Sequence, residues 1–342
     1  MNKNQYNCCY ALALIRLIFV ISLAGCAEQQ SLQTALQTYQ QRMAAVLNIP
    51  APKIITVSLS PYPSIKELKQ TIPLAKIRLA DFYQLKNCQL STLIAERNTT
   101  LGRTQYPSSR YLYEVTVLQA IQQCLDKQDE QSLIKALQHL QSNKQQTLPL
   151  VWADLLQTSS EIRQGFSANQ GFIIGSDKDG LNQTLAALHY LEKLRTVPQA
   201  NGFELESHLA NIQQYQLPAR LWRSQRLLSR NLQQTSRWLK DNEALIQCPG
   251  GKTTQELRYL RNVFQLFFIE TIQPMASKLN HYHYKLNTVF TKLIQNELIS
   301  PVLREQLVAN TGHHFDHYQH VMKQHILFWQ GLYKRCGLSP AG

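Results

Sequence analysis

Near its carboxyl end the chain carries four side chains of the kind that bind metal ions. They are His313, Asp316, His317 and His320. On a helix these positions fall within about a quarter-turn of one another, and histidines four residues apart beside a carboxylate are a known zinc arrangement. The alternative is a solvated polar stripe, since Gln324 continues it. We prefer the stripe, because no supporting residues for a metal are recognisable.

Four arginines form a second set of residues that could bind a ligand. They are Arg223, Arg226, Arg230 and Arg237. If residues 218–240 are helical, these side chains lie within about 60° of one another. No Asp or Glu occurs in that segment. Guanidinium groups match carboxylates and phosphates bidentately, so the stripe either binds an anionic partner or pairs with acids from neighbouring helices. The sequence leaves both interpretations open.

Two short polar motifs resemble ligand-binding loops without completing them. Gly250-Gly251-Lys252-Thr253-Thr254 lacks the first glycine of a nucleotide-binding loop, because Ile246 occupies that position. A turn followed by a threonine helix cap explains it better. Asp177-Lys178-Asp179-Gly180 lacks the third acid and the final glutamate of a calcium loop, and we interpret it as a turn. We therefore expect no nucleotide and no cofactor.

A third polar group lies where a predicted helix ends. Glu96, Arg97 and Asn98 could form a polar site with Glu114. We prefer a structural cluster, in which Arg97 pairs with a carboxylate, because polar groups at a helix junction usually stabilise the fold. The sequence also contains neither G-x-S-x-G nor HExxH, so no catalytic residue is assigned.

Helices are the elements that must position these residues. Apolar side chains recur at three- and four-residue steps through most of the chain. The predicted helices cover residues 28–48, 77–86, 90–97, 107–125, 130–141, 181–196, 204–215, 218–240, 253–272 and 312–335. A separate, poorer helical pattern begins near Trp152. Pro274 is expected to kink or end its helix, after which helix resumes to about Leu298, and Pro301 opens another.

The amino-terminal sequence predicts export. Lys3 and Arg16 precede a short apolar run that ends in Leu23-Ala24-Gly25-Cys26. The run is too short to span a membrane, and the ending resembles the lipobox of bacterial lipoproteins. In that family the chain is cut before the cysteine, which is acylated. The resemblance implies a lipid anchor at Cys26, and Ala27 after it favours the outer membrane, facing the periplasm.

The remaining chain is expected to be all-α: an elongated multi-helix bundle with a proline-rich N-terminal strap and two disulfides. After the signal peptide at 1–25, we expect a helix at 26–48, a strap or linker at 49–73 and a helical domain at 74–342. The prolines between 49 and 63 exclude helix there. Four glycines at 165–180 predict a waist in the helical domain.

Charge and cysteine content narrow the possible partners. The formal net charge is +13, and removal of Lys3 and Arg16 with the signal lowers it by two to +11. Such a charge favours anionic partners or serves solubility alone. An exported, tethered chain rarely meets nucleic acid, so we expect anionic lipid, lipopolysaccharide or cell-wall polymer.

Four cysteines other than Cys26 remain in an oxidising compartment, and four cysteines allow three pairings. Pairing Cys88 with Cys124 and Cys248 with Cys336 closes each loop within its own half of the chain. We expect that pairing, with four reduced thiols as the alternative.

Two stretches of the chain carry a wider resemblance. The first contains Asp81-Phe82, Cys88-Gln89-Leu90, Ala95-Glu96-Arg97-Asn98, Leu101-Gly102, Pro107-Ser108 and Tyr113-Glu114. The second contains Cys248-Pro249-Gly250-Gly251, Leu260-Arg261-Asn262-Val263-Phe264 and Ile272-Gln273-Pro274. Together they resemble a family of Gram-negative lipoproteins whose domain has no assigned function. The resemblance implies secretion, lipidation and paired cysteines, and it supplies no catalytic residues.

Two functional hypotheses follow from these observations. The favoured one is a non-enzymatic, lipid-anchored envelope protein that acts as a scaffold or binds an envelope partner or anionic polymer. The alternative is an envelope hydrolase or metal-dependent enzyme whose site the sequence does not reveal. Convergent carboxylates or histidines in a deep cleft would favour the enzyme, and a charged groove would favour the binding protein.

Overall fold

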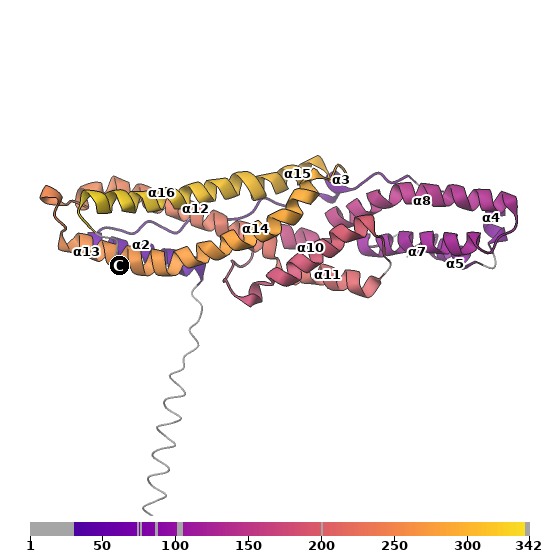
Figure 1. The fold of residues 1–342 in the computed structure, drawn as a ribbon, viewed down its shortest axis with the longest axis horizontal. Helices are drawn as coiled ribbons and strands as arrows, with labels where there is room; N and C mark the ends of the chain where they lie inside the picture. The colour runs from indigo at the N-terminus through magenta and orange to yellow at the C-terminus, as the bar shows by residue number, and fades with distance from the viewer. Residues whose placement is uncertain are drawn as a thin grey trace, which may run out of the picture. The chain divides into compact units, whose positions relative to one another are not determined.

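The structure, a computed structural model, describes residues 31–73, 75, 77–85, 88–100, 105–199 and 201–338. Every regular element in these ranges is a helix (Figure 1). The predicted signal peptide and the predicted lipidation site at Cys26 lie outside the described residues. Residues Leu32–Gly342 form one compact unit that contains both hydrophobic cores and both disulfides, so the chain from Leu32 onward is a self-contained folded body. The all-α class that the sequence predicts is confirmed.

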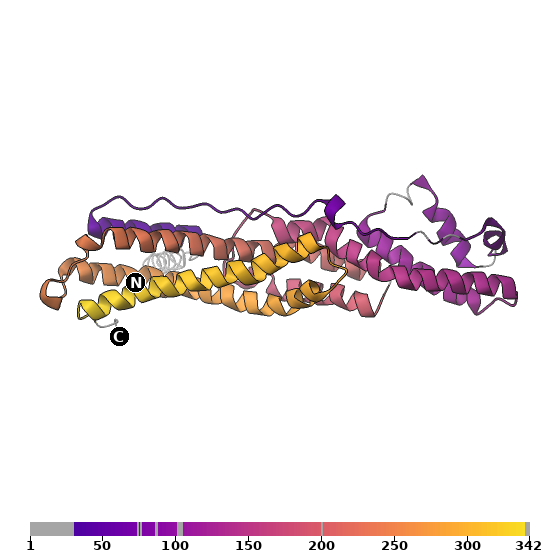
Figure 2. The ribbon, with the colours of Figure 1, turned by 90° about the horizontal axis from the view of Figure 1, so that it is seen from above.

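The unit begins with α2 (Leu32–Leu47) and then a long extended strap. Residues 49–64 form no helix, as their prolines predict, and the short α3 (Ile65–Leu68) ends this part. The strap runs along α12 in Figure 2. Asn231 holds it there: its side chain accepts from the Ile55 amide at 2.9 Å and donates to the Ile55 carbonyl at 3.0 Å. The strap is thus part of the folded body.

A helical hairpin and two short helices follow the strap. They are α4 (Leu79–Gln84), α5 (Gln89–Arg97), α7 (Pro107–Leu125) and α8 (Gln131–Thr158). Figure 1 shows α7 and α8 side by side. They enclose a second, smaller core, and the predicted disulfide between Cys88 and Cys124 lies within it, with 5.7 Å between the Cα atoms.

The separate helices expected at 130–141 and near Trp152 are one helix, α8, so that prediction was wrong. Pro149 lies inside α8 and removes a backbone donor from it. Buried side chains on both sides, Leu148 and Trp152 among them, keep the helix continuous. The Trp152 indole also donates to the Leu191 carbonyl at 2.7 Å. Tertiary packing therefore outweighs the local effect of the proline.

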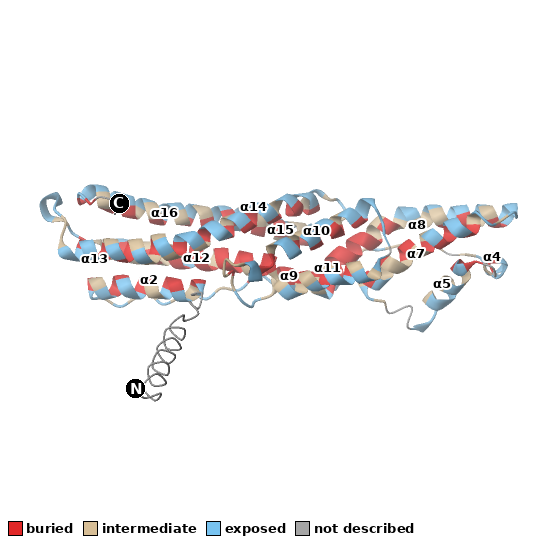
Figure 3. Cartoon of the chain, turned by 60° about the horizontal axis from the view of Figure 1, so that its bottom comes forward, coloured by how far each residue is buried: buried red, intermediate tan, exposed pale blue. Residues whose placement is uncertain are grey.

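The central helices are α9 (Ser160–Ser167), α10 (Leu181–Thr196), α11 (Gly202–Tyr215) and α12 (Leu217–Asp241). Residues 168–176, in the glycine-rich stretch, form no helix, and both sides of that stretch belong to the same compact unit. A leucine stripe on α12 is fully buried: Leu221, Leu228, Leu232 and Leu239 are at most 1% exposed. Figure 3 shows such buried faces along the helices.

The last third of the unit is nearly continuous helix. It contains α13 (Gln255–Val263), the π-helical η4 (Phe264–Ile272), α14 (Gln273–Gln295), α15 (Pro301–Val308), the π-helical η5 (Ala309–His313) and α16 (His314–Arg335). Pro274 does not end its helix, contrary to expectation. The wider π turn precedes it, with the Gln273 amide bonded five residues back to the Phe268 carbonyl. This local widening accommodates a proline in a continuous helix.

One polar cluster lies in the middle of the main core. His325 on α16 is completely buried, and its ring lies 2.9 Å from the Tyr39 hydroxyl and 2.8 Å from the Ser236 hydroxyl. The Trp329 indole N–H, which can only donate, lies 3.3 Å from Nε2. We therefore assign Nε2 as the acceptor and Nδ1 as the protonated nitrogen. The cluster joins α2, α12 and α16. The disulfide Cys248–Cys336 links the end of α16 to the segment between α12 and α13.

Candidate functional site

Two of the sequence's candidate sets meet around one cavity of about 590 Å³. Three segments far apart in the chain form it: one face of α12, the first turn of α16, and the strap at Ile55. We call it the basic pocket. Its lining residues are Ile55, Arg226, Ser229, Arg230, Gln233, Gln234, Arg237, His314 and His317. Arginines from the predicted stripe and histidines from the carboxyl end thus share one site.

The helix spacing of α12 explains why these arginines gather. Residues 226, 230 and 237 lie on one face, opposite the buried leucine stripe. Arg226 is half-buried and fixed at both ends of its guanidinium group, donating to the Ser58 carbonyl at 3.2 Å and to the Asn310 side chain at 2.9 Å. Arg230 and Arg237 are exposed. The pocket therefore has one half-buried cation fixed by two hydrogen bonds and two solvent-accessible cations.

The electrostatics of the basic pocket are strongly positive. Its lining contains no Asp or Glu, and none of the ion pairs in the described residues involves its arginines. Burial, and then the neighbouring charge of Arg230, lower the pKa of Arg226. Loss of hydration lowers the pKa of His314, and Arg226 contributes next. Positive charges are held together here without a countercharge, which is the condition for binding an anion.

Arg223 does not belong to this site, although the helical spacing grouped it with the other three. Its guanidinium group is only partly accessible, donates to the Gly171 carbonyl at 2.8 Å, and lies 4.6 Å from the centre of the Phe172 ring. The residue as a whole is 8% exposed. These contacts tie the glycine-rich segment to α12. Arg223 is thus a structural residue.

The four residues considered for zinc do not assemble into a metal site. Within the described residues, no group of three or more His, Cys, Asp or Glu side chains is placed to hold a metal ion. His317 faces the basic pocket, and the charge of Asp316 acts on His283 instead. The π-helical η5 ends at His313. The direction of the His313 side chain relative to α16 therefore does not follow from the 100° per residue of a regular α-helix. His314, which also lines the pocket, was not singled out, because on α16 it lies about 60° from His317 and outside the quarter-turn that the sequence considered.

The other polar motifs have structural contacts. Thr254 caps α13 by accepting from the Leu257 amide at 3.2 Å, as the cap interpretation predicted. Asp179 is completely buried and pairs with Arg220 at 2.7 Å. It also accepts backbone amides of its own turn, including that of Gly175 at 2.7 Å. The aspartate's charge is therefore compensated within the fold.

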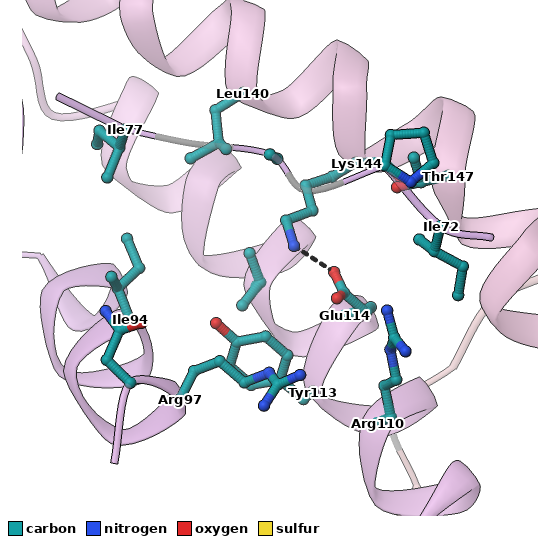
Figure 4. Close-up of a pocket in the computed structure, with 14 residues that line it drawn as sticks. Ile72, Ile77, Ile94, Arg97, Arg110, Tyr113, Glu114, Leu140, Lys144 and Thr147 are labelled. Carbon is teal, nitrogen blue, oxygen red and sulfur yellow. Dashed lines mark hydrogen bonds and ion pairs between the residues drawn. The ribbon is translucent and has the colours of Figure 1, made fainter. Parts of the chain in front are cut away.

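The cluster expected around Glu114 is assembled only in part. Arg97, Asn98 and Glu114 line a second cavity, of about 540 Å³, shown in Figure 4. The ion-pair partner of Glu114 is Lys144 on α8, at 2.6 Å. The Arg97 guanidinium lies 5.8 Å from the centre of the Tyr113 ring.

Comparison with known proteins identifies the domain. Residues 36–340 match the sequence profile of a family described as "Protein of unknown function (DUF3080)". The chain belongs to the DUF3080 family. No curated protein and no solved structure matches the chain. The matched range contains both cavities and all four paired cysteines, and none of the described helices is long and apolar enough to cross a membrane.

Proposed function

We propose that this DUF3080 protein is a non-enzymatic, lipid-anchored protein of the bacterial envelope that binds an anionic envelope component through the basic pocket. The lipobox-like sequence ending at Cys26 supports the anchor, and Ala27 after it supports a location at the outer membrane, facing the periplasm. The absence of a recognisable catalytic motif in the sequence favours binding over catalysis.

One observation carries the binding proposal: three arginines and two histidines line a single cavity whose lining has no carboxylate. A guanidinium group that donates to a backbone carbonyl and to a side-chain amide oxygen can still donate its remaining N–H groups to a ligand. Arg226 is held in this way, and the exposed Arg230 and Arg237 add two forks suited to phosphate or carboxylate oxygens. Phosphate groups of phospholipid or lipopolysaccharide are the matching chemistry in the envelope.

Vesicle binding tests this proposal. The polypeptide from Leu32 onward is mixed with phosphatidylglycerol vesicles or phosphatidylcholine vesicles, and the bound fraction is measured by sedimentation. We expect selective, salt-sensitive binding to phosphatidylglycerol. Each basic residue near an anionic surface contributes about 1 kcal/mol, so Arg230→Gln with Arg237→Gln should weaken binding about thirtyfold.

The matched control removes two positive charges elsewhere. Lys240 and Arg258 are exposed and lie outside the basic pocket, so Lys240→Gln with Arg258→Gln changes the net charge equally. This control should bind nearly as well as the wild type. Equal weakening in both double variants would show that net charge alone drives binding, and salt-insensitive binding would exclude the proposed chemistry.

A further inference from the structure

The second cavity, shown in Figure 4, lies where the small core of the α7–α8 hairpin meets the end of the strap. We call it the junction cavity. The residues that matter for its chemistry are Ile77, Ile94, Arg97, Arg110, Glu114 and Lys144. It is separate from the basic pocket, because the two linings share no residue.

One part of the junction cavity is apolar. Ile77 comes from the segment just before α4, Ile94 from α5, and Val117 and Leu140 from α7 and α8. Val117 is a buried member of the small core. At about 540 Å³, the cavity is within the range of roughly 300–1,000 Å³ typical of small-molecule sites. A hydrocarbon group is the matching occupant for this wall.

The other part of the cavity carries more positive than negative charge. Arg97, Arg110 and Lys144 line it, against the single carboxylate of Glu114. Lys144 already pairs with Glu114, and both side chains are largely buried, 16% and 9% exposed. Arg110 takes part in none of the ion pairs found in the described residues, so its positive charge is available to an anion. In Figure 4 the Arg110 side chain extends toward Glu114, and the Tyr113 ring lies between Arg97 and Lys144.

Arg110 supplies an independent observation. Its Nε atom is buried and has no hydrogen-bond partner in the described residues. The charge of Arg110 also acts on Asp154, but that carboxylate already accepts the Gln70 amide at 3.2 Å. A buried donor without an acceptor is unfavourable by about 1–3 kcal/mol, and an anion in the cavity would satisfy it.

We propose that the junction cavity binds a single-chain anionic amphiphile: an alkyl chain with a carboxylate or phosphate head. The chain lies against Ile77, Ile94 and Leu140, and the head accepts donors from Arg97 and Arg110. Glu114 and Lys144 act as a neutralised pair that closes the polar end. This site is independent of the basic pocket and of the proposed envelope function.

Calorimetry on the polypeptide from Leu32 onward tests this inference with four soluble probes. They are decanoate, decyl phosphate, decyltrimethylammonium and acetate, all below the concentrations at which they form micelles. We expect one molecule of decanoate, decyl phosphate or both to bind per chain, and the stronger of the two identifies the head group. The cationic amphiphile and acetate should not bind, because one has the wrong charge and the other has no chain.

Three variants and one control test which residues bind the amphiphile. Arg110→Gln should weaken binding on the order of tenfold or more, because a charge-assisted hydrogen bond is lost. Glu114→Gln removes the one carboxylate among the described lining residues and should leave affinity unchanged or raise it, whereas a cation site would lose its ligand. Arg230→Gln, in the basic pocket, should have no effect. Lys135→Gln, an exposed position on α8, is the control.

Three results would overturn the inference. They are binding of none of the amphiphiles, equal binding of the cationic and anionic amphiphiles, and an affinity unchanged by Arg110→Gln. If Arg110→Gln unfolds the chain, the affinity of Glu114→Gln for the amphiphiles still shows which charge the site prefers.

Discussion

Acidification should destabilise the folded unit through two buried histidines. His325 has no room to hydrate a charge, so burial lowers its pKa to about 3. Burial likewise lowers the pKa of His283 to about 4, and its ring stacks on Phe315 with 3.4 Å between ring centres. Both folded-state values lie below the ordinary value of about 6.5 expected in the unfolded chain. The unfolded chain therefore binds more protons, and stability is lost as the pH falls from about 6.5 toward 4 and 3.

The size of the effect follows from these values. Between pH 7 and pH 5 the unfolded chain protonates each histidine almost fully, while the folded chain leaves both neutral. A pKa of about 3 against 6.5 gives a loss of about 2 kcal/mol for His325 over that interval, and His283 gives about the same. Together these losses are a large fraction of a typical domain's stability of about 5–15 kcal/mol.

Urea unfolding followed by circular dichroism at pH 7 and pH 5, with disulfides intact, measures this loss. The wild type should lose about 4 kcal/mol of unfolding free energy between the two values. His325→Gln should be less stable at pH 7, because the Tyr39 and Ser236 hydroxyls lose the imidazole, yet its loss on acidification should be about half as large. His320→Gln, an exposed position on the same helix, is the control and should retain the full loss.

Two results would refute this reasoning. One is a wild-type stability that does not change between pH 7 and pH 5. The other is an acid loss in His325→Gln as large as in the wild type, which would place the proton uptake at other groups.

The remaining predictions concern the backbone, a disulfide and the anchor. Gly180 has φ of 74°, and a Cβ there would overlap the Tyr215 ring, so Gly180→Ala should lower stability by roughly 3 kcal/mol or more in thermal melts. An unchanged melting temperature would contradict this. Replacing Cys248 and Cys336 together by serine should remove about 4 kcal/mol, and mapping of non-reduced wild-type peptides should find that pair linked. Cys26→Ser should abolish palmitate labelling; equal labelling would exclude the anchor.

The fold was largely predictable because local signals and packing agree along most of the chain. Residues 181–196 are helical as predicted, since Gly180 begins the helix and an apolar face continues through it. Continuous helix through Pro149 and Pro274 was not predicted, because packing at Pro149 and a π turn before Pro274 outweigh the local preference of proline. Both disulfides were paired correctly from the requirement that each loop close within its own half.

Only the residues of the basic pocket that lie on α12 could be predicted from the sequence. Arg226, Arg230 and Arg237 follow from regular spacing along α12, whereas Arg223 differs because the returning glycine-rich segment covers it. His314 and His317 lie three residues apart on α16, but only packing against α12 and the strap shows that both line the same pocket. Ile55 lines the pocket because the strap packs against α12, which is more than a hundred residues away in the sequence. No local sequence pattern encodes such a contact.

The most direct test of an anion site in the basic pocket is an NMR titration of its histidines. Neighbouring cations and loss of hydration lower the pKa of His314, so a bound anion should raise it. The imidazole signals of the polypeptide from Leu32 onward are followed against pH with and without saturating phosphate. We predict a higher pKa for His314 in phosphate and a smaller change in Arg230→Gln. A His314 titration that is identical with and without phosphate would contradict the account.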